Sequence, residues 1–318
     1  MDHRGKKLLG FFAATFGILT TAWAAGSTHP LREMAWLSVE GRIEALTTEP
    51  SSGFRINANS LDESDTILSG EALFHAPSLL GGQAAKAGIS CASCHVNGRD
   101  NPNFQFPGVS GAPGTADVTH SFFSSHRGDG SHNPITIPDL TKTGKISKHN
   151  EGELEEFIRG LVVEEFNGAE PAQATLHAVT SYVRALCDVG QNDPVPITLQ
   201  THWARTERAI LMAEKFHVEE PEMARLLLSN ARHQLGLVHE RYTGRKLAKE
   251  RQQLLNLSER IKALQNIVGT SEKSYRDLAK ATMDQMIETK KMLKKSEKQS
   301  LYNVQVLTTL LNEPSPRP

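Results

Sequence analysis

The chain has 318 residues, 38% of them hydrophobic and 22% charged, so it is long enough for two modest domains with buried cores. Its 35 basic and 36 acidic residues give a net charge of −1 at pH 7. This balance excludes proteins that bind nucleic acid or anionic lipid through a strongly basic overall charge.

The N-terminus has the layout of a secretory signal peptide. A basic start precedes an apolar run from Leu8 to about Trp23, which closes on the small-residue pattern AWA. An uncleaved membrane anchor is the alternative, but roughly 16 apolar residues are short for a span of about 20. We expect residues 1–24 to be removed on export to the periplasm. Cleavage after Ala24 removes three basic residues and one acidic residue and leaves a net charge of −3. No other run in the sequence approaches membrane-spanning length.

Residues 25–60 are expected to form an N-terminal helix and a polar loop. From Leu31 to Leu46 the apolar residues recur near one stripe, as in an amphipathic helix. The next predicted helix, DTILSGEALFHA, has a candidate N-cap in Ser64 or Asp65.

Residues 81–152 are rich in Gly, Pro, Ser and Asn and show little periodicity. A loop of about 70 residues is uncommon inside a compact domain. We therefore expect this segment to wrap a large apolar group that replaces a protein core. Two helices with apolar residues at helical spacing are predicted to follow, GELEEFIRGLVVEEF and PAQATLHAVTSYVRALC. The proline-containing run at residues 189–199 then indicates a linker.

Residues 200–313 are predicted to form a separate helical domain. They contain one proline, Pro221, and are dense in Leu, Lys, Glu, Gln, Arg and Ala. We expect helices over residues 201–217, 221–268 and 274–311, with Pro221 in the first turn of the second.

The second of these helices carries an apolar stripe that steps by three and four residues, as in a coiled coil: Leu254, Leu257, Ile261, Leu264 and Val268. The predicted arrangement is a long helical hairpin or a three-helix bundle. Its helices either pack on the preceding domain or bind a protein partner.

The stretch ISCASCHVNG places Cys91 and Cys94 three residues apart, with His95 directly after them. This is the signature of covalent haem c attachment. Within one helical turn the two thiols reach the vinyl groups of one haem, and the imidazole becomes the proximal ligand of its iron. A C-x-x-C pair alone could instead form half of a zinc site or a redox dithiol. The adjacent histidine, the predicted export and the lack of a second cysteine pair favour haem, and Cys187 is expected to be a lone buried thiol.

The run SGEALFHAPSLLGG before this motif, and the runs NPITIPDLTKTGKISKHNEGELEEFIRGLVVEEF and TLHAVTSYVRALC after it, carry a resemblance to a known family. Together they resemble a haem domain of the bacterial dihaem cytochrome c peroxidase and MauG group. The resemblance covers about residues 65–188. It implies a mainly α fold in which residues 61–188 form a cytochrome c-like haem domain. Those enzymes need two attachment motifs, whereas this chain has one, so their two-haem relay is not expected.

The distal ligand of the iron is not evident, because no methionine lies between His95 and Cys187. The resemblance places Lys148-His149 where that group commonly offers methionine or tyrosine. We therefore rank His149 first and His126 second. Arg127 beside His126 could meet a haem propionate. The other candidates are His120, His132 and His177 in the domain and Met34, Met212 and Met223 in flanking helices.

These features favour a periplasmic electron carrier or relay subunit that works with a redox partner protein. The alternative is a peroxidase or MauG-like enzyme with an open iron, in which Glu151, Glu153 or a histidine would move protons. A third hypothesis is a haem-based sensor or assembly factor with the C-terminal helices as its docking surface. The missing second haem favours electron transfer over catalysis, and no catalytic residue is assigned.

Overall fold

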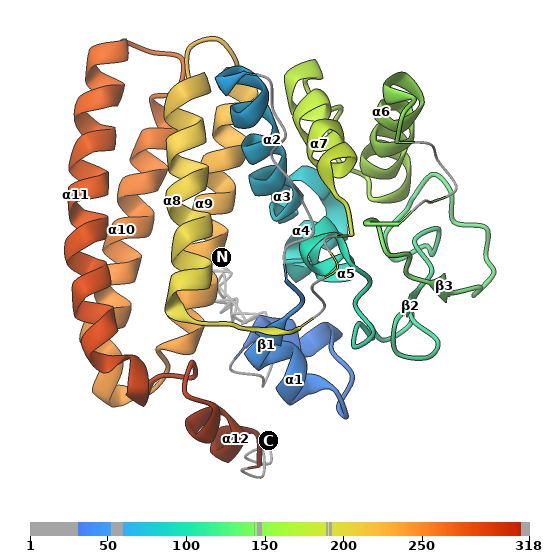
Figure 1. Cartoon of the computed structure of the whole chain (residues 1–318), viewed down its shortest axis with the longest axis horizontal. Coiled ribbons are helices and arrows are strands. Elements are labelled where there is room, and N and C mark those ends of the chain that lie inside the picture. Colours follow the sequence, from blue (N-terminus) through green and yellow to red (C-terminus); the bar gives the residue numbers. More distant parts are fainter. Residues whose placement is uncertain are drawn as a thin grey trace, which may run out of the picture.

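The structure is a computed structural model that describes residues 31–51, 60–142, 144, 148–188, 190 and 193–312. The predicted signal peptide lies outside these residues. The described chain is mainly helical, which confirms the mainly α part of the predicted fold class. Figure 1 shows a bundle of long helices on one side and shorter helices with irregular loops on the other.

The segment before α2 forms two short helices, so the single amphipathic helix expected there is wrong. A 3-10 helix, η1 (Arg32–Trp36), is followed by α1 (Arg42–Thr47). Between them Leu37 forms a β-bridge with Phe104, which pulls the backbone out of the helical path. Val39 is consequently 70% exposed instead of lying on a buried stripe.

Helices α2 (Leu61–Phe74) and α7 (Gln173–Ala185) pack against each other beside the cysteine motif. Helix α2 begins earlier than expected because Ser60 is its N-cap. The Ser60 hydroxyl accepts a hydrogen bond from the backbone N–H of Glu63 at 3.1 Å. The predicted apolar stripe of α7 is confirmed, since all its members are buried: Leu176, Val179, Tyr182, Val183 and Leu186.

Gly70 sets how closely these two helices approach. A Cβ atom at this position would lie 1.9 Å from the carbonyl oxygen of Ala178 and 2.8 Å from Cβ of Tyr182. Neither atom can move without displacing α7, so only glycine fits the crossing. The close approach brings the ring of Tyr182 to 5.2 Å from that of Phe74, between centroids.

The long irregular segment contains only short elements, as its composition indicated. They are α3 (Pro77–Leu80), α4 (Gly82–Ala87), α5 (Cys91–Cys94), η2 (Val96–Gly98), β2 (Thr115–Ala116) and β3 (Ile135–Thr136). Strands β2 and β3 pair antiparallel. The segment leads into α6 (Glu151–Gly160), which continues as a π-helical turn, η3 (Leu161–Glu165).

The C-terminal helices differ from the predicted three. They are α8 (Leu199–Phe216), α9 (Pro221–Arg241), η4 (Arg245–Leu247), α10 (Ala248–Asn266), α11 (Glu272–Ser296), η5 (Glu297–Gln299) and α12 (Val304–Asn312). The single helix expected over residues 221–268 is wrong, because Gly244 adopts a φ of 100° and reverses the chain. Helix α11 ends at Ser296, and after η5 the Leu301 N–H donates to Arg241 O at 2.8 Å. Helices α8 to α11 form a bundle, and the predicted coiled-coil stripe lies buried inside it.

The bundle packs directly on α2 and α3, and one continuous cluster of buried apolar residues runs through both parts. Strand β1 (Thr48–Glu49) pairs antiparallel with β4 (Val195–Pro196), which ties the predicted linker to the N-terminal segment. Arg205 of α8 adds an ion pair to Glu49 at 2.9 Å. In the described part of the chain, no helix is both long enough and apolar enough to cross a membrane.

The crossing at Gly70 gives a stability prediction. We expect Gly70→Ala to lower the free energy of unfolding by about 3 kcal/mol, near the upper end of the usual cost of overpacking. The matched control is Gly160→Ala in α6, where a Cβ meets no atom within 4 Å. There alanine should raise stability by up to about 1 kcal/mol through its helix propensity. Urea denaturation of both variants measures the difference, and equal effects would contradict the crossing.

Candidate functional site

The cysteine motif occupies one isolated helical turn, α5. Ser90 begins it with a capping box, in which the Ser90 backbone N–H donates to Ser93 Oγ at 3.0 Å. Because Cys91 and Cys94 are three residues apart on this turn, their side chains emerge on the same side. Both are free thiols and partly exposed. The turn therefore presents two neighbouring sulfur atoms followed by an imidazole.

The imidazole of His95 is oriented by the segment that follows β3. Its Nδ1 lies 3.0 Å from the backbone oxygen of Pro138, which can only accept a hydrogen bond. Nδ1 is then the donor, and Nε2 carries the lone pair that a metal needs. Burial lowers the pKa of His95 to about 4, although the Pro138 carbonyl acts in the opposite direction. The ring is thus neutral at physiological pH, and its Nε2 lone pair is free of a proton.

The surroundings of the two thiols disfavour their ionisation. Burial raises the pKa of Cys91 and of Cys94 to about 12, and in Cys94 the neighbouring Cys91 adds to the effect. Reactive dithiols and zinc ligands act as thiolates, which such surroundings disfavour. Both thiols are thus held in the protonated form.

The loop after the turn holds the motif in place. Asn101 N–H donates to the Cys94 carbonyl at 3.0 Å, and Asn101 Nδ2 donates to Ser93 O at 2.8 Å. On the other side, the ring of Phe74 lies 6.4 Å from that of His95. The donor set and its aromatic neighbour therefore fit a covalently held haem.

Arg99 is buried next to this loop and does not pair with Asp100. Its guanidinium lies 3.3 Å from Asp188 and 3.8 Å from Asp139. The Nε atom of Arg99 is buried and has no hydrogen-bond partner among the described residues. One donor of Arg99 is therefore left over, as a propionate contact would require.

Of the two ranked distal candidates, both His149 and His126 lie at exposed positions. The turn that bears His149 is close to the motif, because Lys148 Nζ donates to Leu186 O at 3.0 Å and also bonds Leu140 O. Leu140 N–H in turn donates to Gly98 O at 2.8 Å. Distal ligation by His149 stays a prediction.

The surroundings of the other candidates are less suited to an iron ligand. Arg127 beside His126 is engaged by Glu164 and, at 3.1 Å, by Glu165. This pairing ties the His126 loop to η3. Met34 and Met223 are buried in the core, at 5% and 2% exposure. His120 and His132 lie with their ring centroids 6.2 Å apart in the same loop.

A pocket of about 440 Å³ lies on the opposite side of the motif turn. Ala92, Ser93 and Val96 form one wall of it, whereas the two cysteines and His95 do not line it. The other walls come from α2, α8, α9 and the N-terminal segment, with these polar side chains: His75, His202, His233, Arg205, Gln234 and Glu33. The turn thus separates the sulfur atoms from this polar pocket, which we call the polar chamber.

Three histidines in this chamber are held neutral. Burial lowers the pKa of His75 and His202 well below the usual value, and lowers that of His233 to about 3. His202 Nδ1 hydrogen-bonds the Tyr302 hydroxyl at 2.8 Å. His75, directly after α2, is likewise a buried residue. Sequence reasoning missed this cluster because its members come from three helices far apart in the chain.

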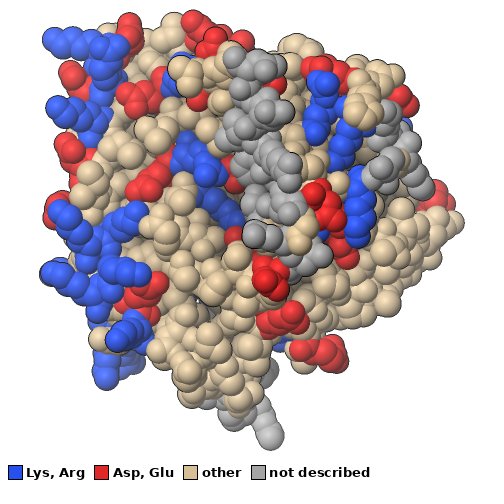
Figure 2. Space-filling model, in the orientation of Figure 1, with Lys and Arg blue, Asp and Glu red and all other residues tan. Residues whose placement is uncertain are grey.

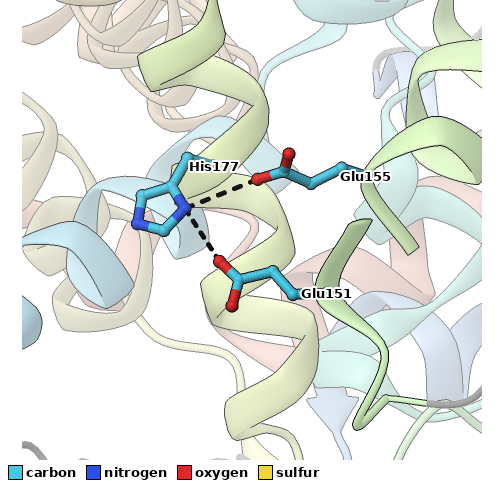
Figure 3. Close-up of side chains that lie close together, drawn as sticks. All are labelled: Glu151, Glu155 and His177. Atoms are coloured by element: carbon cyan, nitrogen blue, oxygen red, sulfur yellow. Dashed lines mark ion pairs between the residues drawn. The ribbon is translucent and has the colours of Figure 1, made fainter. Parts of the chain in front are cut away.

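A second cluster joins α6 to α7. Figure 3 shows His177 pointing at Glu151 and Glu155, with Nδ1 3.1 Å and 3.4 Å from their oxygens. Their potential ligand atoms lie within 4.8 Å of one another. Arg184 also pairs with Glu151, and Gln173 donates to Glu155 at 3.1 Å. Because these partners already use the carboxylates, the cluster is best described as a set of polar contacts that joins α6 to α7.

No family model, curated protein or solved structure matches this chain. The resemblance to the dihaem peroxidase and MauG group therefore stays a prediction from the residues around the motif.

The neutral histidines of the polar chamber lead us to expect that the free energy of unfolding falls steeply in acid. Between the unfolded pKa of about 6.5 and the folded value of about 3, His233 is protonated only in the unfolded chain. Stability is therefore lost as the pH falls below about 6.5. We expect His233→Gln to reduce the slope of unfolding free energy against pH by about 1.4 kcal/mol per unit.

Urea denaturation between pH 7 and pH 5 measures this slope. The same substitution at His132, an exposed loop residue, is the control. Identical slopes for the His233→Gln variant and the unaltered protein would contradict the neutral state of His233.

Proposed function

We propose that the chain is an exported c-type cytochrome that holds one covalent haem and transfers electrons to or from a partner protein. The observation that carries the proposal is the geometry of one turn: two free thiols three residues apart, followed by His95 with Nδ1 bonded to Pro138 O. Thioether bonds would form at Cys91 and Cys94, and His95 Nε2 would bind the iron. When bound, the haem supplies one-electron redox chemistry at its iron.

Contacts around this turn support the proposal of a cytochrome c-like domain over residues 61–188. Helices α2 and α7 support Phe74 beside His95, and Asn101 fixes the turn from the other side. These contacts support the imidazole and the backbone of the turn. A rigid proximal side suits electron transfer, because it limits movement of the ligand between two redox states.

Electron transfer is favoured over a peroxidase by what surrounds the candidate acids. Glu151 is taken up by Arg184 and His177, and Glu153 accepts a hydrogen bond from Asn150 Nδ2 at 3.0 Å at the start of α6. A general acid or base must be able to reach the proton it moves. Both carboxylates instead serve helix contacts.

Covalent haem can be tested directly. Expressed together with a haem-attachment system and exported, the protein should carry one haem that survives denaturation, seen as a single mass increase and a haem-stained gel band. We expect Cys91→Ala with Cys94→Ala to abolish the attachment, while Cys187→Ala serves as the matched cysteine control and retains it. A protein that stays unmodified, or whose attachment depends on Cys187, would refute the assignment.

The distal side is tested by optical and EPR spectra of the haem-loaded protein. We expect a low-spin iron whose reduced form does not bind carbon monoxide, because a side chain fills the sixth position. His149→Ala should convert it to a high-spin form that binds carbon monoxide, whereas His126→Ala should not. A high-spin iron in the unaltered protein would oppose a simple carrier and favour the peroxidase hypothesis.

A further inference from the structure

Basic residues gather at one end of the helical bundle, although the whole chain is almost neutral. The turn between α9 and α10 and the end of α11 meet there, since Tyr242 donates from its hydroxyl to Leu293 O at 2.8 Å. Seven exposed basic side chains lie on these segments, and we call them the basic end: Arg245, Lys246, Lys249, Lys291, Lys294, Lys295 and Lys298.

Few carboxylates offset this charge. Glu288 and Glu297 pair with Lys291 and Lys294, at 2.9 Å and 2.7 Å. The other five basic side chains make no ion pair with any described residue. Figure 2 shows the contrast at the left edge of the molecule, where blue predominates in the lower part and is mixed with red in the upper part.

An uncharged helix lies next to the basic end. Helix α12, with the sequence VQVLTTLLN, contains no charged residue. Its start is tied to η5, since Asn303 Nδ2 donates to Lys298 O at 3.0 Å. Figure 1 shows α12 below the bundle. Its Val304 is 45% exposed and its Leu307 is buried. Val306, Leu310 and Leu311 are partly buried against the core, so α12 places one exposed valine beside the basic end.

We propose that the basic end and α12 form a docking surface for an anionic phospholipid membrane. Lysine stems can lie on the headgroup region while their ammonium groups meet phosphates, and an uncharged helix can enter the interface. The composition favours lipid over an acidic protein. Six of the seven basic side chains are lysine, a residue depleted from protein interfaces, where arginine is enriched.

The docking is peripheral and electrostatic. Each lysine or arginine near an anionic surface adds about 1 kcal/mol to binding, and the attraction falls off within a Debye length of about 10 Å at 0.1 M salt. Net charge alone cannot reveal such a surface, because it averages the basic end with acidic residues elsewhere. This inference is independent of the proposed function, since none of its residues belongs to the motif or its loop.

Vesicle co-sedimentation of the exported protein tests the proposal, with phosphatidylcholine vesicles containing one quarter phosphatidylglycerol and with pure phosphatidylcholine. We expect binding to the anionic vesicles only, lost at 1 M salt. Charge reversal at Lys294, Lys295 and Lys298 should lower the partition coefficient by about 100-fold or more. Val304→Ser, which alters no charge, should lower it about threefold.

The control reverses three lysines at the other end of the hairpin, Lys262, Lys273 and Lys280, and so makes the same change in net charge. It should keep most of the binding. All variants share the same N-terminus, so any contribution of residues 1–24 cancels in the comparison. Equal binding to neutral vesicles, equal loss in both triple variants, or no binding to either kind of vesicle would each overturn the proposal. The last outcome would leave an acidic protein as the partner of the basic end.

Discussion

The close crossing of α2 and α7 at Gly70 is the constraint on which the candidate site depends. A Cβ there would lie 1.9 Å from Ala178 O, so the two helix axes can approach only because this side chain is absent. Their approach places Tyr182 against Phe74, and Phe74 against His95. A residue that makes no chemical contribution thus decides where the imidazole lies.

The second constraint is polar and comes from the loops. Pro138 O orients the imidazole through Nδ1, and Asn101 holds the backbone of α5. The proline ring fixes φ at Pro138. Its carbonyl therefore offers the imidazole an acceptor on a stiff stretch of backbone. Packing on one side and hydrogen bonds on the other leave Nε2 as the chemically available atom of His95.

Several elements followed directly from the sequence, and the failures have identifiable physical causes. The α7 stripe was predictable because it is buried on one face alone. The long second helix of the bundle was not, since its apolar pattern runs on through the turn at Gly244, whose φ of 100° leaves no trace in the periodicity. The motif itself could be recognised from three residues. The contact with Pro138 could not, because it joins positions 43 residues apart.

The bundle is part of the site's support as well as a separate group of helices. Arg205 of α8 donates to Asn97 Oδ1 at 3.2 Å and also holds Glu49, so it joins η2, directly after the motif, to the N-terminal segment. Asn97 in turn donates from Nδ2 to Pro50 O at 2.7 Å. Any force on the bundle is therefore transmitted to the loop behind His95 by packed and hydrogen-bonded contacts. The basic end and the proposed haem at α5 would consequently be connected through packed elements. Docking of the basic end on a membrane would then set the orientation of the haem.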